Sequence, residues 1–417
     1  NDAQLKWIDP ETGLATYKKE YENNNKFDFM QSVLWTTSGG TVQNWSTQRN
    51  LNYQLQLNWG REFGKHNISA MGLMSRQETA TGSMIPYYRE DWVFRTTYAF
   101  ANRYFFEYNG AYNGSEKFSA DNRFAFFNSG ALGWMISDES FMKPLKFVDM
   151  LKLRASYGEI GDDNINGRWL YMTQWAYGGT SSLEVNNGRS PYTWYRESAV
   201  GNPDVHWETV RKSNLGIDYS FLGGLFAGSV EIFRDNRRDI LVNGATRTVP
   251  PYYGATPATA NLGKVKTDGY ELELRVNKVL ANKMRLWGNF SMTHAKNTIL
   301  EKDDPALYAA YQKAAGFSID QNRAYVDAGF VNNYDEVYAS TVHDKTDLHK
   351  LPGDYYVIDF NADGVIDSKD NVPYGYSGSP QNTYSGSPEN TYNATLGFEW
   401  KGFSAFAQFY GVTNVTR

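Results

Sequence analysis

The chain of 417 residues has a formal net charge of −5, with 41 Lys and Arg against 46 Asp and Glu, and it contains no Cys. The absence of Cys excludes disulfides, zinc-thiolate sites and thiol nucleophiles, and the slightly acidic balance argues against a nucleic-acid partner. A mean hydropathy of −0.58, with no apolar run of about 18 residues, excludes a helical membrane protein but not a transmembrane β-barrel.

Alternation of apolar and polar residues with a period of two is the main signal along the chain. Leu51, Tyr53 and Leu55 alternate with amide residues, and similar patterns cover 214–221, 270–277 and 392–400. Successive side chains of a strand point to opposite faces, so each segment has one apolar and one polar face. This alternation, with enrichment in Tyr, Phe, Val and Thr, predicts about thirteen strands. They lie near 26–37, 48–61, 65–79, 86–101, 103–118, 121–136, 149–161, 207–221, 225–241, 262–276, 283–299, 390–401 and 403–415.

The predicted links between these strands alternate in length. Short links include 61–65, 101–102, 223–224, 277–282 and 401–402, and long ones include 162–206, 242–261 and 300–389. Short turns at one end and long loops at the other are typical of an up-and-down barrel in an outer membrane. We therefore expect 162–206 and 300–389 to be long extracellular loops.

Aromatic residues recur beside the short links, at Trp59, Phe100, Trp134, Phe221 and Trp400. Aromatics at one end of many strands form a girdle at the level of the lipid headgroups. A soluble sandwich or propeller is the alternative, but a compact soluble domain rarely carries a loop of about ninety residues. The expected fold class is all-β, a large antiparallel transmembrane β-barrel with long extracellular loops.

The predicted strand number is odd, whereas bacterial single-chain barrels close with an even number of strands. The last predicted strand, near 403–415, also lies at the end of the chain, which stops at Arg417. We therefore expect residues 1–417 to form part of one outer-membrane β-barrel domain.

One segment has the spacing of a calcium-binding loop. Carboxylates or amides stand at positions 1, 3, 5, 9 and 12 of 359–370, with Gly at position 6. Alternate oxygens around a sharp glycine turn can surround Ca²⁺, and position 7 supplies a backbone carbonyl. The last position is Asp instead of the bidentate Glu of a helix-loop-helix hand. An Asp-rich turn without metal is the alternative. The predicted ligands of a structural Ca²⁺ are Asp359, Asn361, Asp363, Val365, Asp367 and Asp370.

The predicted loop 162–206 is rich in large aromatic residues. Exposed rings on a loop suit stacking on sugars or contact with a protein partner. The alternative is that they only hold the loop against its neighbours, as large aromatics usually do. The candidates for substrate or partner contact are Trp169, Tyr171, Trp175, Tyr177, Tyr192, Trp194 and Tyr195.

Catalytic signatures are missing from the sequence. It contains no phosphate-binding loop, dinucleotide fingerprint or G-x-S-x-G motif. Charged residues on the polar strand faces, among them Lys152, Arg154 and Glu271, are explained by a water-filled barrel interior. We therefore expect a protein that is not an enzyme.

Several motifs together resemble one known family. They are the stretches 104–108, 133–142, 151–158, 202–208, 214–218, 261–265, 269–271 and 353–354, followed by the acidic loop. The most specific are Asn202-Pro203 followed by Trp207-Glu208, and the acidic loop. In this order they resemble the barrel of the SusC/RagA-type TonB-dependent outer-membrane transporters of the Bacteroidota.

The resemblance implies a 22-stranded barrel with an N-terminal plug and a TonB box, neither of which is visible in this chain. It implies active import of oligosaccharides or peptides across the bacterial outer membrane, with a SusD-like surface lipoprotein as a lid. Coupling to TonB-ExbB-ExbD would run through the N-terminal part, and outer-membrane lipid would surround the barrel. A passive porin and a non-transporting scaffold or adhesin are the alternatives.

Overall fold

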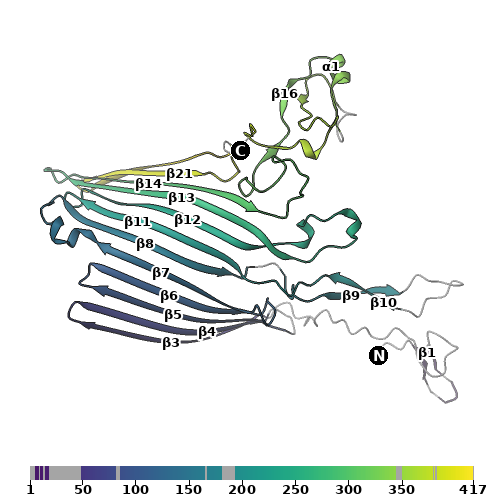
Figure 1. The fold of residues 1–417 in the computed structure, drawn as a ribbon, viewed down its shortest axis with the longest axis horizontal. Helices are drawn as coiled ribbons and strands as arrows, with labels where there is room; N and C mark the ends of the chain where they lie inside the picture. The colour runs from purple at the N-terminus through teal and green to yellow at the C-terminus, as the bar shows by residue number, and fades with distance from the viewer. Residues whose placement is uncertain are drawn as a thin grey trace.

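The computed structural model describes residues 5–8, 10–12, 15–17, 48–80, 85–164, 167–180, 193–343, 350–378, 380 and 383–416. Within this part of the chain, twelve strands form one large antiparallel sheet (Figure 1) in the order β22-β21-β14-β13-β12-β11-β8-β7-β6-β5-β4-β3. Apart from small strands in the two longest loops, strands that follow one another in the chain are neighbours in the sheet. This is the up-and-down topology that the sequence predicts.

The twelve long strands correspond one by one to predicted segments. They are β3 (Arg49–Phe63), β4 (His66–Ala80), β5 (Tyr87–Phe100), β6 (Tyr104–Ser115), β7 (Phe124–Met135), β8 (Val148–Asp162), β11 (Glu208–Phe221), β12 (Phe226–Val242), β13 (Ala260–Val279), β14 (Arg285–Glu301), β21 (Asn390–Trp400) and β22 (Phe403–Thr413). The thirteenth predicted segment, 26–37, lies outside the described residues. The all-β, antiparallel fold class is therefore confirmed.

The short turns gather at one end of the sheet and the long loops at the other (Figure 1). A two-residue turn joins β21 to β22 through Lys401 and Gly402, which both have positive φ, 47° and 85°. Two such residues make a hairpin turn whose twist matches that of the flanking strands. The longer link at this end contains two 3-10 turns, η1 (Ile136–Asp138) and η2 (Ser140–Met142).

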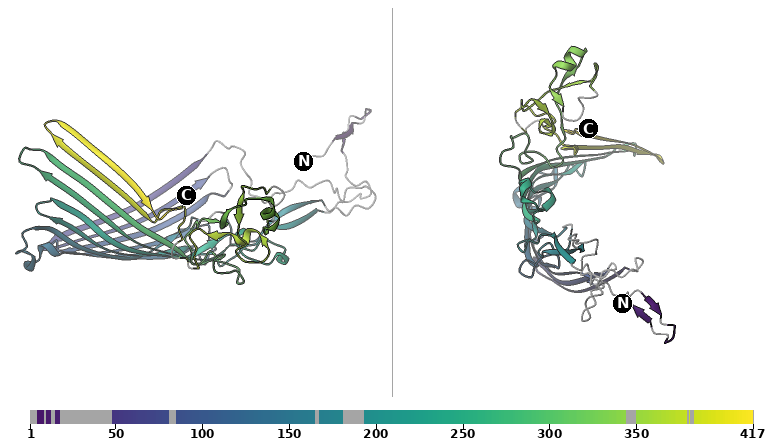
Figure 2. Two further views of the ribbon diagram at one scale, coloured as in Figure 1. Left: turned by 90° about the horizontal axis from the view of Figure 1, so that it is seen from above. Right: turned by 90° about the vertical axis from the view of Figure 1, so that its right-hand side faces the viewer.

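The strand register sorts side chains onto two faces of the sheet. Ile217, Val230, Leu272 and Met292 are directly paired across β11 to β14 and form one apolar row. Val230 is 40% exposed, because nothing in the described chain covers this face. The sheet curves into an open trough, as Figure 2 shows. One apolar face and one polar face are what a barrel wall between lipid and water requires.

The long loops have secondary structure of their own. The first carries a hairpin of β9 (Gln174–Thr180) and β10 (Thr193–Ala199). The second contains β15 (Arg323–Ala324), β16 (Asp327–Phe330), α1 (Tyr334–Ala339), β17 (Val342–His343), β18 (Tyr355–Val357), β19 (Val365–Ile366), η6 (Ser368–Asp370) and β20 (Val372–Pro373). Further short elements are β1 (Leu5–Ile8), β2 (Ala15–Tyr17), η3 (Gly244–Thr246) and η4 (Pro251–Tyr253). Across the described residues, no helix is long and apolar enough to cross a membrane.

A small hydrophobic core fixes the first long loop to the end of the sheet. Phe118, Phe127, Val205 and Trp207 are all buried and pack together. The Trp207 indole also donates a hydrogen bond to the Arg123 carbonyl oxygen at 3.2 Å. This core joins the link before β7, β7 itself and the residues before β11, so the C-terminal end of the aromatic-rich loop is anchored at the loop end of the sheet.

Candidate functional site

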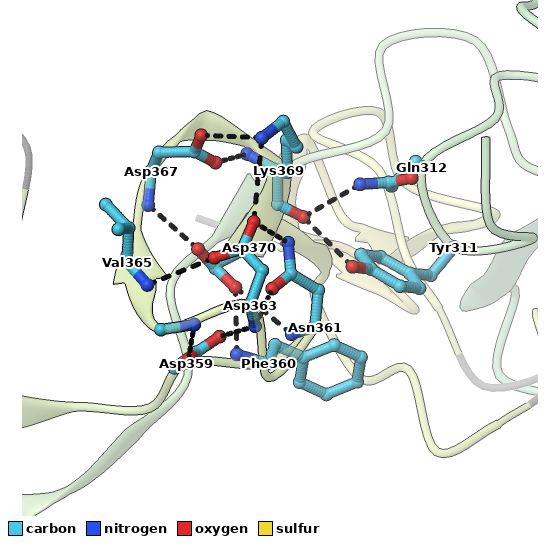
Figure 3. Close-up of polar contacts among 11 residues, drawn as sticks. Tyr311, Gln312, Asp359, Phe360, Asn361, Asp363, Val365, Asp367, Lys369 and Asp370 are labelled. Carbon is cyan, nitrogen blue, oxygen red and sulfur yellow. Dashed lines mark hydrogen bonds and ion pairs between the residues drawn. The ribbon is translucent and has the colours of Figure 1, made fainter. Parts of the chain in front are cut away.

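The acidic loop is organised around one buried carboxylate, that of Asp370. Asp370 is fully buried and accepts hydrogen bonds from the backbone N–H groups of Phe360 at 2.9 Å, Asn361 at 3.2 Å and Asp367 at 2.8 Å (Figure 3). These three bonds tie the end of the motif to its beginning. The loop therefore closes on itself through the Asp370 carboxylate.

The first half of the motif curls around its glycine. Asp359 accepts from the Gly364 amide at 2.8 Å, and Asn361 accepts from the Asp363 amide at 2.8 Å. Gly364 has a φ of +91°, a conformation that side chains with a Cβ rarely adopt. The side-chain oxygens of positions 1, 3 and 5 are therefore gathered on one turn, but they are held by backbone amides.

The cation beside these carboxylates is a lysine. The Lys369 ammonium lies 3.1 Å from an Asp367 carboxylate oxygen and 3.6 Å from one of Asp363, and the hydrogen bond to Asp367 raises the pKa of Lys369 above its ordinary value. In the part of the chain that the structure describes, no group of three or more His, Asp or Glu residues has the arrangement of a metal site. The oxygen donors suit Ca²⁺ chemically, but a metal would have to displace this ammonium.

The acidic loop is attached to the beginning of the second long loop through Tyr311. The Tyr311 hydroxyl donates to the Lys369 carbonyl oxygen at 3.0 Å (Figure 3), and its ring packs edge-on against Phe360, with 4.9 Å between the ring centroids. Burial, followed by the charges of Asp370 and Asp363, raises the pKa of the Tyr311 hydroxyl. Tyr311 therefore stays protonated and holds the loop against its neighbour.

Two of the predicted contact aromatics, Trp169 and Tyr171, share one pocket. They line a cavity of about 460 Å³ with Tyr88, Arg89 and Arg123, at the loop end of β5 and β6. Rings and guanidinium groups side by side suit a sugar or a peptide.

Sequence reasoning missed the residue that places Trp169. The Arg168 guanidinium donates to the carbonyl oxygens of Ile85 at 2.7 Å and Pro86 at 2.8 Å, and it forms an ion pair of 3.1 Å with Glu116. It also lies over the rings of Tyr87 and Trp169, 4.1 and 4.8 Å from their centroids. A single Arg in a loop has no distinguishing pattern in the sequence.

The other predicted contact residues lie on or near the β9–β10 hairpin. Tyr177 and Tyr195 face each other across it, with 5.9 Å between the ring centroids. Trp175 and Tyr195 are 58% and 54% exposed. Tyr192 lies outside the described residues, as does the side chain of Trp194. The structure therefore separates the candidates into a pocket pair and a hairpin group.

The polar face of the sheet carries ion pairs where the sequence predicts barrel-interior charges. Arg154 donates to Asp218 at 2.9 Å and to Glu231 at 2.6 Å, and Asn214 donates to Glu231 at 2.9 Å. These groups come from three adjacent strands, β8, β11 and β12. They form a charged, half-exposed surface on one wall.

Comparisons with known proteins agree with this architecture. The model of the family "TonB dependent receptor-like, beta-barrel" matches residues 2–416. The TonB-dependent receptor SusC of Bacteroides thetaiotaomicron is 31% identical over 293 residues, which are 67% of this chain and 27% of that protein. The TonB-dependent receptor P26 of Formosa agariphila is 23% identical over 413 residues, 87% of this chain and 40% of that protein.

Solved structures show the same fold. The RagAB peptide importer in its closed-closed state superposes with a TM-score of 0.66 at 14% identity, covering 88% of this chain and 41% of that one. Its open-open state gives a TM-score of 0.62 at 16% identity, covering 88% of this chain and 40% of that one. The chain spans less than half of the length of each of these relatives. It belongs to the TonB-dependent receptor-like β-barrel family, whose members are multi-pass proteins of the bacterial outer membrane.

Proposed function

We propose that the full-length protein imports oligosaccharides or peptides across the outer membrane in a TonB-dependent manner, as the barrel subunit of a SusCD-like complex. The family match along residues 2–416 carries this proposal. The likeness to a structure named as a peptide importer favours peptide among the possible cargoes. Residues 1–417 supply part of one barrel, with the long loops 162–206 and 300–389 on the extracellular side.

The two faces of the sheet support a transport role. The apolar face meets lipid, whereas the ion pairs around Arg154 keep the opposite face hydrated. A hydrated interior with charges of both signs allows a polar cargo to pass. A plug and a TonB box, supplied by another part of the protein, would make that passage depend on energy from TonB-ExbB-ExbD.

The test is uptake of labelled oligosaccharides and peptides by cells that carry the full-length protein. Import that stops when TonB is deleted, together with a surface lipoprotein that co-purifies with the barrel, is the expected result. Uptake that continues without TonB would favour the passive porin. A barrel that reaches the surface but takes up nothing would favour the scaffold or adhesin.

We also propose that the loop aromatics contact the cargo or the lipoprotein, with Trp175 and Tyr195 contributing most among the described residues. Removing two exposed rings that contact a partner weakens its binding by about tenfold or more. Replacing both with Ala is therefore expected to raise the concentration of half-maximal uptake about tenfold. Glu197→Gln on the same hairpin is the matched control, and unchanged uptake by the double variant would leave these rings a purely structural role.

A second proposal concerns the acidic loop, which we propose binds one structural Ca²⁺ through Asp359, Asn361, Asp363, Asp367, Asp370 and the Val365 carbonyl. The oxygen-only donor set supports it. Lys369 competes for the same carboxylates, since it contacts both Asp363 and Asp367.

Tb³⁺ tests the calcium proposal, because Tyr311 is bonded directly to the loop and can sensitise its luminescence. The full-length protein is expected to give a luminescence signal that Ca²⁺ displaces. Asp363→Asn is expected to weaken binding, and Lys369→Met is expected to strengthen it by removing the competing cation. If neither luminescence nor heat of Ca²⁺ binding is detected in any variant, the loop is an Asp-rich turn without metal.

A further inference from the structure

Cationic side chains line a groove on the lipid-facing side of the sheet. It lies across β11 to β14 and has a volume of about 830 Å³. Its charged lining consists of Arg234, Lys266, Lys296 and Asp268, with His294 beside them. We call this set the rim groove. Its lining holds three cations and one carboxylate, and the Lys296 ammonium also contacts Glu389, which lies outside the lining.

The strand register shows which face the rim groove occupies. Arg234 pairs with Ser213 and Asp268, and Asp268 pairs with Lys296, so these residues form one row on one face. The next row towards the short turns is Leu215, Ile232, Tyr270 and His294, and the row after it is the apolar row that contains Val230. Residues two apart on a strand share a face. The charges of the rim groove therefore stand directly above the apolar band.

The depth of the row places these charges at the headgroup level of the membrane. Arg234 lies eight residues along β12 from Phe226, the aromatic residue at the short-turn end. Eight residues span about 27 Å along a strand and about 20 Å of height at the usual tilt. The apolar band of such barrels is about 25 Å tall. The rim groove therefore lies near the outer edge of the band, at the end that carries the long loops.

The charges of the rim groove are only partly neutralised by the protein. Arg234 and Lys266 share the single carboxylate of Asp268, at 2.5 and 2.7 Å, and the Arg234 side chain remains 59% exposed. Lys296 contacts Glu389 at 3.0 Å and is 34% exposed. An Arg guanidinium has five N–H donors and a Lys ammonium has three. Donors therefore remain for a further anion.

The same face elsewhere on the sheet is balanced. At the loop end of β3 to β5 it carries Arg49, Arg76, Glu78 and Glu90, two cations against two carboxylates, and Arg49 pairs with Glu78 at 2.6 Å. Contact with water alone explains equal numbers of cations and carboxylates at this end of the sheet. It does not account for cations gathered in one groove over apolar rows. The contrast points to an anionic ligand that also has an apolar part.

We infer that the rim groove binds the phosphate group of an anionic lipid in the outer leaflet. The phosphate sits between Arg234, Lys266 and Lys296, where Arg and Lys form strong charge-assisted hydrogen bonds. The acyl chains lie on Leu215, Ile232 and Tyr270, which are exposed on the row below. The groove continues the lipid-facing surface of the barrel, and a lipid is therefore its immediate neighbour.

The test uses the full-length protein in a neutral detergent and native mass spectrometry with dioleoylphosphatidic acid, with dioleoylphosphatidylcholine as the zwitterionic reference. The wild-type protein is expected to prefer phosphatidic acid. Each cation removed from the groove is expected to weaken that binding about fivefold, so the triple variant Arg234→Gln, Lys266→Gln and Lys296→Gln loses about a hundredfold. The matched control is Arg49→Gln with Arg76→Gln, which is expected to leave the preference unchanged.

A variant that is expected to bind more tightly is also needed, because a loss of binding can result from misfolding but a gain cannot. Asp268→Asn removes the only carboxylate of the rim groove and is expected to strengthen phosphatidic acid binding about fivefold. The inference is overturned if the triple variant binds like the wild type, if the control variant loses as much, or if Asp268→Asn weakens binding. It is also overturned if inorganic phosphate alone binds as tightly as the lipid, since a small-anion site needs no acyl chains. None of these outcomes depends on whether the protein transports anything.

Discussion

The full-length protein with Val230→Arg is expected to lose about 2–4 kcal/mol of folding free energy in a bilayer. Val230 lies four residues from Phe226 on the apolar face of β12 and is paired with Ile217 and Leu272. Four residues correspond to about 10 Å of height at the usual tilt, near the middle of the apolar band. A guanidinium at this depth must leave water, and both of its described cross-strand neighbours are apolar. The loss is measured as a shift of the urea midpoint for folding into phosphatidylcholine vesicles. The folded fraction is monitored by the electrophoretic mobility of unheated samples.

The matched control is Ser229→Arg, the next residue of β12 on the opposite face. Ser229 is paired with Asp218 on one side and Glu273 on the other, so an arginine there gains acidic neighbours in a hydrated interior. Its effect is expected to stay within about 0.5 kcal/mol, as for other surface substitutions. If both arginine variants fold with the wild-type midpoint, both faces of the sheet are wet and the membrane-facing assignment is wrong.

The long strands could be predicted because their signal is local. In β3 and β13 the alternation of apolar and polar residues lies within one segment and needs no knowledge of the neighbours. The up-and-down order follows from the short links, because two antiparallel strands joined by a tight turn pair with each other. For this reason the predicted bounds of the twelve described strands agree with the structure to within a few residues.

The structure inside the long loops could not be predicted in this way. β17 and β19 are two residues long, parallel and separated by more than twenty residues. Pairs this short depend on contacts between distant segments and leave no periodic pattern. The sequence did not predict the β9–β10 hairpin, because the aromatic residues around Trp175 and Tyr195 do not alternate strictly with polar residues.

The acidic loop shows the same division between local and non-local information. The spacing of 359–370 predicted oxygens around a sharp glycine turn. In the structure, bonds to nearby backbone amides hold the oxygens of Asp359, Asn361 and Asp363 on that turn. The role of Lys369 could not be read from the spacing. Its ammonium reaches Asp363 only because the loop closes through Asp370. Whether a metal replaces it stays a prediction.

Asp370→Ala is the second substitution with a large expected effect, because it removes the centre of this loop. Three backbone amides, those of Phe360, Asn361 and Asp367, donate to its carboxylate in a fully buried position. Hydrogen bonds to a charged group contribute about 1.5–3 kcal/mol each, and a buried donor left without a partner adds a desolvation cost. The free energy of local opening is therefore expected to fall by at least about 3 kcal/mol.

Hydrogen exchange of the full-length protein, measured by mass spectrometry on peptides that cover 355–376, detects this loss as exchange at least about a hundredfold faster. The strands of the sheet should exchange as in the wild type, because they share no hydrogen bond with Asp370. Asp363→Ala is the matched control, since Asp363 accepts one backbone amide at 3.0 Å, that of Val365, and is part-exposed. A chelator is present throughout, so that any contribution of a metal is removed. The exchange rate is expected to be highest in Asp370→Ala, lower in Asp363→Ala and lowest in the wild type. Equal exchange in Asp370→Ala and wild type would mean that the loop is held by its neighbours, chiefly Tyr311, and not by its buried carboxylate.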